Sequence, residues 1–160
     1  MPDAPQVRIV ESYRDYTPPL NVPFLIRQLL DTVPEKYLRG LDCVVLTNET
    51  SFNKRDRRPT GSRRKRRGKV VFRRYHGRAR SSGSYVELRV DRIVAGVKGW
   101  KLYVPFLSAL VFSHVLFHEI GHHIHRLIRP EYKEKEGVAN KWAGKLMANF
   151  IRERYCMQCF

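Results

Sequence analysis

The sequence predicts an α+β fold in which a small antiparallel sheet packs on two long helices. Two stretches near the end of the chain, residues 105–128 and 131–151, have the apolar content and spacing of helices. Between residues 41 and 91, short runs of β-branched and aromatic residues have the pattern of strands. With 160 residues and a 42% hydrophobic composition, the chain suits a single globular domain over residues 1–160.

The first third of the chain is expected to form an arm, a helix and a strand. Residues 13–23 look irregular because they include three prolines. Residues 24–30 have helical spacing, and Pro34 ends that helix or opens a further turn. Residues 41–47 are apolar and rich in β-branched side chains, which indicates a strand. The face of the helix expected to point inward consists of Phe24, Leu25, Leu29 and Leu30.

Two further strands are expected to pair as a hairpin. Residues 70–75 are strand-like, and residues 85–91 alternate between apolar and polar side chains. Residues 77–83 would join them. We expect another short strand at residues 100–104, after which Pro105 opens a long helix, because a missing N–H is harmless in the first turn.

A strongly basic segment separates the first strand from the hairpin. The chain has a formal charge of +16, and residues 54–80 alone hold 14 Lys or Arg against one acid, which is +13. The part at about 54–69 lacks apolar residues and is expected to be an exposed, mobile loop. It favours non-specific contact with DNA or RNA phosphates, although an acidic protein partner would suit it too. The candidate contact residues are Arg57, Arg58, Arg63, Arg64, Lys65, Arg66 and Arg67.

The long helix from Pro105 carries the most informative motif, His118-Glu119-Ile120-Gly121-His122. Residues four apart lie on one face of a helix, so both imidazoles can reach one Zn²⁺. Glu119 would stand beside the open coordination position, where a carboxylate can take a proton from water. Gly121 has no side chain, so the backbone of another segment could pack close to the motif.

The final helix supplies a candidate third ligand. Its apolar stripe consists of Ala139, Trp142, Ala143, Leu146, Met147 and Phe150. Glu136 lies one turn earlier on the same stripe, and a carboxylate there must be paired, exposed at the helix end, or bound to a metal. We therefore expect Glu136 to complete the zinc site. Asn140, one turn after Glu136, would then orient a ligand imidazole by a hydrogen bond.

These residues resemble the pattern H-E-x-x-H…E-x-x-A-N-x-F-A of ImmA/IrrE-like zinc metallopeptidases, a compact gluzincin group. The matching segments are 118–122 and 136–143, with Trp142 in place of the usual Phe, and the resemblance covers about residues 113–146. The basic segment has no counterpart in the pattern.

The resemblance implies a minimal zincin-like domain with a metal-binding helix and a following ligand helix. His118, His122 and Glu136 would hold one Zn²⁺ per chain, with Glu119 as the general base and Asn140 supporting the site. The reaction implied is hydrolysis of a peptide bond in a protein or peptide substrate by a water that zinc activates. We expect the substrate to lie extended along an edge strand near residues 85–91.

Other zinc families fit less well. Metzincins and SprT-like proteases would place a third histidine where this chain has Ile128, and Cys43 lacks the Gly-rich setting of the deformylase ligand. The group that stabilises the oxyanion is not identified; Tyr103, His125 and Tyr155 are candidates without support from spacing. Two other functions stay open: a nucleic-acid-binding regulator with a structural or inactive zinc site, and an interaction module for an acidic protein.

The cysteines and the apolar segments bear on location. Cys43 falls in an apolar strand, and Cys156 and Cys159 form a CxxC tail at 156–159 of undetermined role. An odd number of cysteines without an apparent secretory signal suits a reducing cytoplasm. Residues 102–117 are too short a run to span a membrane, so we expect no membrane span.

Overall fold

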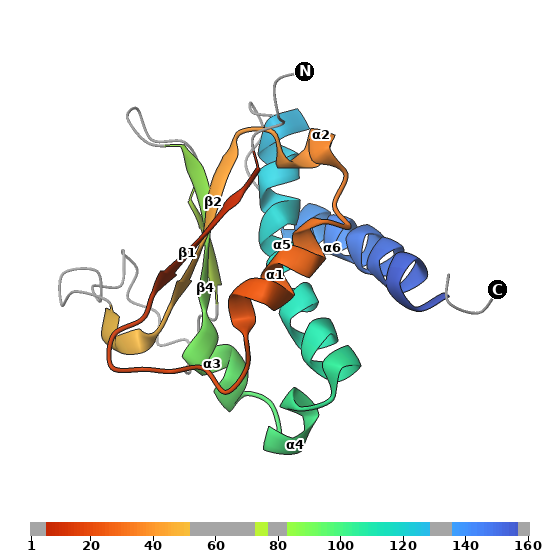
Figure 1. The fold of residues 1–160 in the computed structure, drawn as a ribbon. Coiled ribbons are helices and arrows are strands. Elements are labelled where there is room, and N and C mark those ends of the chain that lie inside the picture. The colour runs from red at the N-terminus through yellow and green to blue at the C-terminus, as the bar shows by residue number, and fades with distance from the viewer. Residues whose placement is uncertain (1–5, 52–72, 77–82, 129–135, 157–160) are drawn as a thin grey trace, which may run out of the picture.

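A computed structural model describes residues 6–51, 73–76, 83–128 and 136–156, and it combines one sheet with helices on one of its faces (Figure 1). The elements, in chain order, are β1 (Arg8–Ser12), α1 (Val22–Leu30), α2 (Glu35–Leu38), β2 (Leu41–Thr47), the 3₁₀ turn η1 (Glu49–Ser51), β3 (Arg73–His76), β4 (Ser84–Arg89), α3 (Val90–Ala95), α4 (Gly99–Leu102), α5 (Pro105–Ile128), α6 (Glu136–Ile151) and the π-helical turn η2 (Arg152–Cys156).

The sheet has the strand order β1-β2-β4-β3, and its directions correct the prediction of an antiparallel sheet. β1, β2 and β4 run parallel, with Val10 opposite Val45 and Val45 opposite Glu87. Among the strands in the described ranges, only β3 is antiparallel, paired with β4 as the expected hairpin. The α+β class holds, but the sheet is mixed.

The parallel strands follow from an element that the sequence did not reveal. β1 lies in the N-terminal arm just before the irregular residues 13–23, where no strand was predicted, and α1 carries the chain back from β1 so that β2 starts at the same end of the sheet. β4 then pairs with β2 on one side and β3 on the other. The expected substrate position along residues 85–91 is therefore wrong, because β4 is internal and residues 90 and 91 belong to α3.

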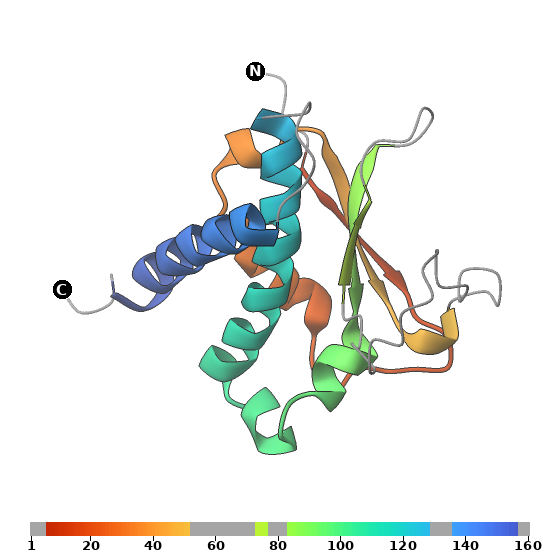
Figure 2. The same ribbon diagram turned by 180° about the vertical axis from the view of Figure 1, so that it is seen from behind.

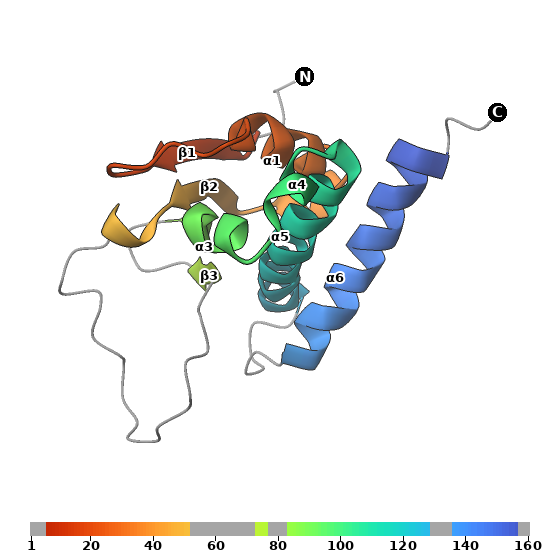
Figure 3. The ribbon, with the colours of Figure 1, turned by 90° about the horizontal axis from the view of Figure 1, so that it is seen from below.

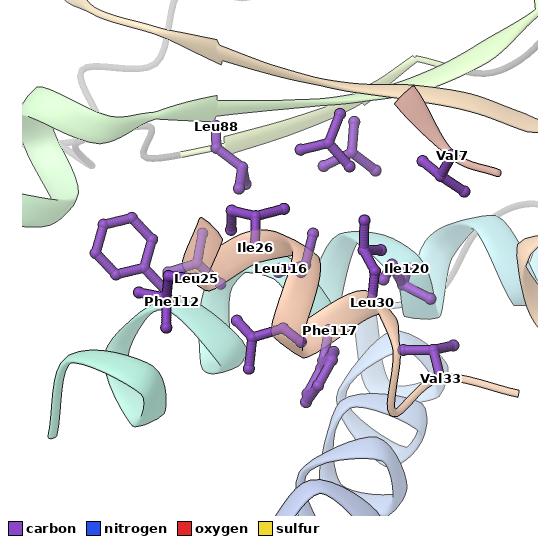
Figure 4. Close-up of a cluster of buried hydrophobic side chains, with 14 of the residues drawn as sticks. Val7, Leu25, Ile26, Leu30, Val33, Leu88, Phe112, Leu116, Phe117 and Ile120 are labelled. Atoms are coloured by element: carbon purple, nitrogen blue, oxygen red, sulfur yellow. The ribbon is translucent and has the colours of Figure 1, made fainter. Parts of the chain in front are cut away.

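The core lies between the sheet and a layer formed by α1 and α5, and α6 packs on the side of α5 away from the sheet (Figure 3). Val44, Leu46, Val86 and Leu88 are fully buried on the sheet face that meets these helices. Phe112, Leu116 and Ile120 project from α5 toward that face, beside Ile26 of α1 (Figure 4). One cluster of buried hydrophobic residues runs from Val7 to Phe150.

The helical predictions are mostly confirmed. α5 begins at Pro105, and α6 buries Ala139, Leu146 and Phe150 along the predicted stripe. Residues 41–47 form β2 as predicted. None of the described helices is long and apolar enough to cross a membrane.

Two local predictions are wrong. Residues 99–102 form the short helix α4 rather than the start of a strand, although their aromatic and apolar alternation resembles one. Phe24, expected in the core, has 61% of its surface exposed, because the buried face of α1 consists of Val22, Leu25, Ile26, Leu29 and Leu30. The basic loop at 54–69, with its candidate contact residues, and the tail beyond Cys156 lie outside the described residues.

Candidate metal centre

The central part of α5 places the two histidines and Glu119 inside the protein. Residues from Val115 to His125 are all buried, because this part of the helix packs against the sheet layer on one side and α6 on the other (Figure 2). His118, Glu119 and His122 are exposed by only 4%, 4% and 9%. Their potential ligand atoms all lie within 4.8 Å of one another, so this buried group could hold a metal ion.

The start of α6 brings two further predicted residues to this group. A Glu136 carboxylate oxygen lies 3.2 Å from Nε2 of His118, and the other oxygen lies 3.9 Å from Nε2 of His122. Asn140, one turn along α6, contacts His118 from the other side of the ring. The structure therefore brings together His118, Glu119, His122, Glu136 and Asn140.

A close helix crossing makes this meeting possible. A Cβ atom at Gly121 would lie 2.6 Å from the carbonyl oxygen of Ala139, closer than real contacts allow. The absence of a side chain at Gly121 thus lets the backbone of α6 approach the metal helix, as the sequence predicted. Ala139 lies between Glu136 and Asn140 along α6. The close crossing at Ala139 therefore brings both of these side chains within reach of His118.

The distances fit a tetrahedral cation site. Neighbouring ligand atoms of tetrahedral zinc are about 3.3 Å apart when each lies about 2.05 Å from the metal. The two Nε2 atoms of His118 and His122 are 3.1 Å apart, and the Glu136 carboxylate adds separations of 3.2 and 3.9 Å. Two imidazole lone pairs repel at such a separation unless a proton or a cation lies between them. The donor set of two imidazoles and a carboxylate suits zinc and leaves one position for water.

A hydrogen bond to Asn140 sets the tautomer of His118. Nδ1–H of His118 donates to Oδ1 of Asn140 over 2.8 Å. An amide oxygen only accepts, so the proton stays on Nδ1 and the lone pair is on Nε2, the atom that faces His122 and Glu136. This is the outer-shell hydrogen bond that fixes ligand histidines in metal proteins.

The two carboxylates at the site differ in burial: Glu119 lies inside the protein and Glu136 at its surface. Burying an ionised carboxylate such as Glu119 is unfavourable without nearby compensation, and a divalent cation at the shared donors would provide it. Glu136 differs, since 76% of its side chain is exposed. The site therefore lies at a boundary, with its histidines held in the core and its third donor in contact with solvent.

Contacts from α2 and the turn after it brace both helices of the site. Nε2–H of His123 donates to the carbonyl oxygen of Arg39 over 3.0 Å. Burial lowers the pKa of His123, while this hydrogen bond raises it in part, so the ring is neutral at pH 7. The ring of Trp142 on α6 packs edge-on against Tyr37 at 5.0 Å between centroids. The sequence patterns gave no sign of these α2 contacts, because they join residues distant along the chain.

The candidates for the oxyanion stabiliser do not gather at the site. Tyr103 and Tyr155 line a groove at the opposite end of α5, which begins roughly 20 Å along the helix from His118. They are therefore excluded from direct contact with the reacting group. His125 is buried one turn beyond His122, and it is not among the residues whose donor atoms cluster at the metal site.

Comparisons of the chain with protein-family models, curated proteins and solved structures find no match. The case for a function therefore rests on the residues and distances of this site.

Proposed function

We propose that the protein is a zinc metallopeptidase of the gluzincin type, similar to the ImmA/IrrE-like group. One observation carries the proposal: the His118, His122 and Glu136 donors have the mutual distances of a tetrahedral zinc site, with the buried Glu119 beside them. We assign Glu136 rather than Glu119 as the third ligand because a Glu136 carboxylate oxygen lies 3.2 Å from Nε2 of His118, and because Glu119 holds the position of the general base in H-E-x-x-H.

The residues of the chain would divide the chemistry as follows. His118 and His122 hold the metal from the buried helix, and Glu136 holds it from the solvent side. Bound zinc would lower the pKa of water and polarise a peptide carbonyl. Glu119 takes the proton from the attacking water and passes it to the leaving amine as the peptide bond breaks. Asn140 keeps the lone pair of His118 directed at the metal position.

The outer edge of β3 is the best place for a substrate. Of the two edge strands that the structure describes, β1 and β3, it is β3 that packs against the helix α5 with the metal-site histidines. An extended peptide could pair with such an edge through main-chain hydrogen bonds, which place a scissile bond without demanding a particular side chain. We propose that protein or peptide substrates bind there, beside the metal-binding face of α5.

A structural or inactive zinc site is the main alternative, in a protein that regulates through nucleic acid. Glu119 distinguishes a catalytic zinc site from a structural one, because a site that only stabilises the fold has no use for a buried carboxylate that is not a ligand. A cytoplasmic location is part of the proposal and follows only from the odd number of cysteines.

The test compares Glu119→Gln with the wild type and with Glu35→Gln, a matched change at an exposed position on α2. Zinc content is measured by mass spectrometry, and cleavage is measured on a peptide library derived from digested cell protein. We expect all three proteins to bind about one zinc, and Glu119→Gln to lose roughly 10²–10⁴-fold in cleavage rate. Equal cleavage by Glu119→Gln and wild type would show that Glu119 is not the general base.

Nucleic-acid contact is a second proposed activity, based on the +13 charge of residues 54–80. Affinity for duplex DNA or RNA should be weak, nearly independent of sequence, and should fall steeply as salt rises, because each phosphate contact releases counterions. Deleting residues 54–69 should abolish this affinity and keep the zinc content. DNA binding that persists after the deletion, or identical partners pulled down before and after nuclease treatment, would contradict it.

A further inference from the structure

A groove lies where α1, α4, η2 and the start of α5 meet. Its volume is about 440 Å³, within the range of natural ligand sites. Its residues have no part in the proposed chemistry. The residues that line it include Phe24, Tyr103, Ser108, Ala109, Phe150 and Arg154.

The walls of the groove are helical and about two turns long. Five residues of α1 and its cap line it, at positions 21, 24, 25, 28 and 29, which is the i, i+3, i+4, i+7, i+8 stripe of one helix face. This stripe extends roughly 12 Å along the axis. Phe150 of α6 and Arg154 of η2 also line it, as do the small side chains of Ser108 and Ala109 of α5. A groove lined by the faces of several helices suits another helix laid along it.

The groove also presents aromatic surface to solvent. Phe24 and Tyr103 both line it and are 61% and 74% exposed. Exposed aromatic side chains around a concave apolar surface are typical of sites where a protein partner is bound.

The charge of the groove favours a partner that carries an acidic residue. Among the described residues that line it, Arg154 is the only charged one, and none is acidic. An apolar helix carrying a carboxylate beside its apolar stripe would pair with this guanidinium. A second copy of the chain is disfavoured, since two molecules of formal charge +16 repel each other.

We propose that this groove docks an amphipathic helix of another protein, with an acidic residue adjacent to an apolar stripe that spans about two turns. Phe24 and Tyr103 contact the apolar residues, and Arg154 receives the carboxylate. The proposal is independent of the metal centre.

The experiment uses the full chain and synthetic fluorescent helical peptides of about four turns. One peptide has Leu at i, i+3 and i+7 with flanking Glu; a second has Lys in place of Glu; a third scrambles the first, keeping its charge and removing its amphipathic pattern. Fluorescence polarisation gives the affinities at fixed salt. We expect the Glu peptide to bind at least about tenfold more tightly than either control.

Variants test the residues. Phe24→Ala and Tyr103→Ala should each lower the affinity for the Glu peptide by about tenfold. Trp100→Ala is the matched control, because Trp100 is also exposed on this end of the molecule but does not line the groove, and it should change nothing. Arg154→Glu should lower the affinity for the Glu peptide and raise the affinity for the Lys peptide. Unchanged zinc content and circular dichroism show that each variant is folded.

Three results would overturn the proposal. The scrambled peptide binding as tightly as the amphipathic one would indicate general attraction to a basic protein. Dodecanoate binding with the same dependence on Arg154, without competition from the Glu peptide, would indicate a small amphiphile. Dimerisation in sedimentation experiments that Phe24→Ala abolishes would indicate that the chain covers its own groove.

Discussion

The two helices that form the metal centre differ in how the protein holds them. The central part of α5 is buried on every side, so His118 and His122 are positioned by the core itself. α6 buries only one stripe, and its first two turns present the exposed Glu136 and Asn140, which both approach His118. Two of the proposed ligands are thus fixed by packing, and the position of the third depends on how closely one helix crosses the other.

This difference shows how a second helix can add the third donor to an H-E-x-x-H helix. Hydrophobic burial cannot orient Glu136, because its side chain is mostly in water. The close approach of Gly121 to Ala139 and the hydrogen bond from His118 to Asn140 position the start of α6 instead. If this comparison is right, changes on α5 and α6 should have graded effects on metal binding.

The largest effect should come from the buried ligands. His122→Ala removes an imidazole from a site that the core has already formed, so zinc affinity should fall by more than the roughly 100-fold seen when a supporting residue is lost. Glu136→Ala should also lose zinc, but the exposed position can admit a water as a replacement ligand, so its loss should be smaller than that of His122→Ala. Competitive titration with a zinc chelator measures both affinities. Full zinc retention in Glu136→Ala would remove this residue from the ligand set.

Asn140→Ala should have the next largest effect on zinc binding. Without the Oδ1 acceptor, His118 is free to place its proton on Nε2, so zinc affinity or turnover should fall by roughly 10- to 100-fold. Asn140→Asp keeps an acceptor at the same place and should restore most of the affinity. Both are measured by the same chelator titration, with the unfolding midpoint as the check on folding. Wild-type affinity in Asn140→Ala would mean that the contact does not orient the ring.

Gly121→Ala should lower stability, and zinc affinity should fall with it because Glu136 and Asn140 move together with α6. The added methyl would collide with the Ala139 carbonyl and push α6 away, at a cost of about 1–3 kcal/mol in the free energy of unfolding. Gly144→Ala is the matched control on α6, because nothing lies within 4 Å of its Cβ position. It should stabilise the protein by about 1 kcal/mol through helix propensity. Urea denaturation of the zinc-free proteins distinguishes them, and equal stabilities would deny the close crossing.

Much of the helical framework could be predicted from the sequence because its signals are local. Pro105 marks the start of α5, and the stripe from Ala139 to Phe150 identifies the buried face of α6. The site residues were named from spacing alone, and the structure places them together. The need for Gly121 was also foreseen, since only a glycine leaves room for a second backbone there.

The sheet could not be predicted in the same way. A strand such as residues 41–47 has the same apolar pattern whether its neighbours run parallel or antiparallel, so strand direction depends on connections. β1 has mostly exposed residues and pairs on one side only, and it therefore lacks the apolar run that identified β2. The hydrogen bond from His123 to Arg39 links positions 84 residues apart, which no local pattern encodes.

The place of the basic segment along the sequence bears on how the protein can vary. Residues 52–72 connect η1 to β3, an edge strand of the sheet, and contain none of the residues of the candidate metal site. A change in the length or charge of this segment therefore removes no candidate ligand, which makes its basic sequence a feature that selection can adjust separately from the proposed chemistry.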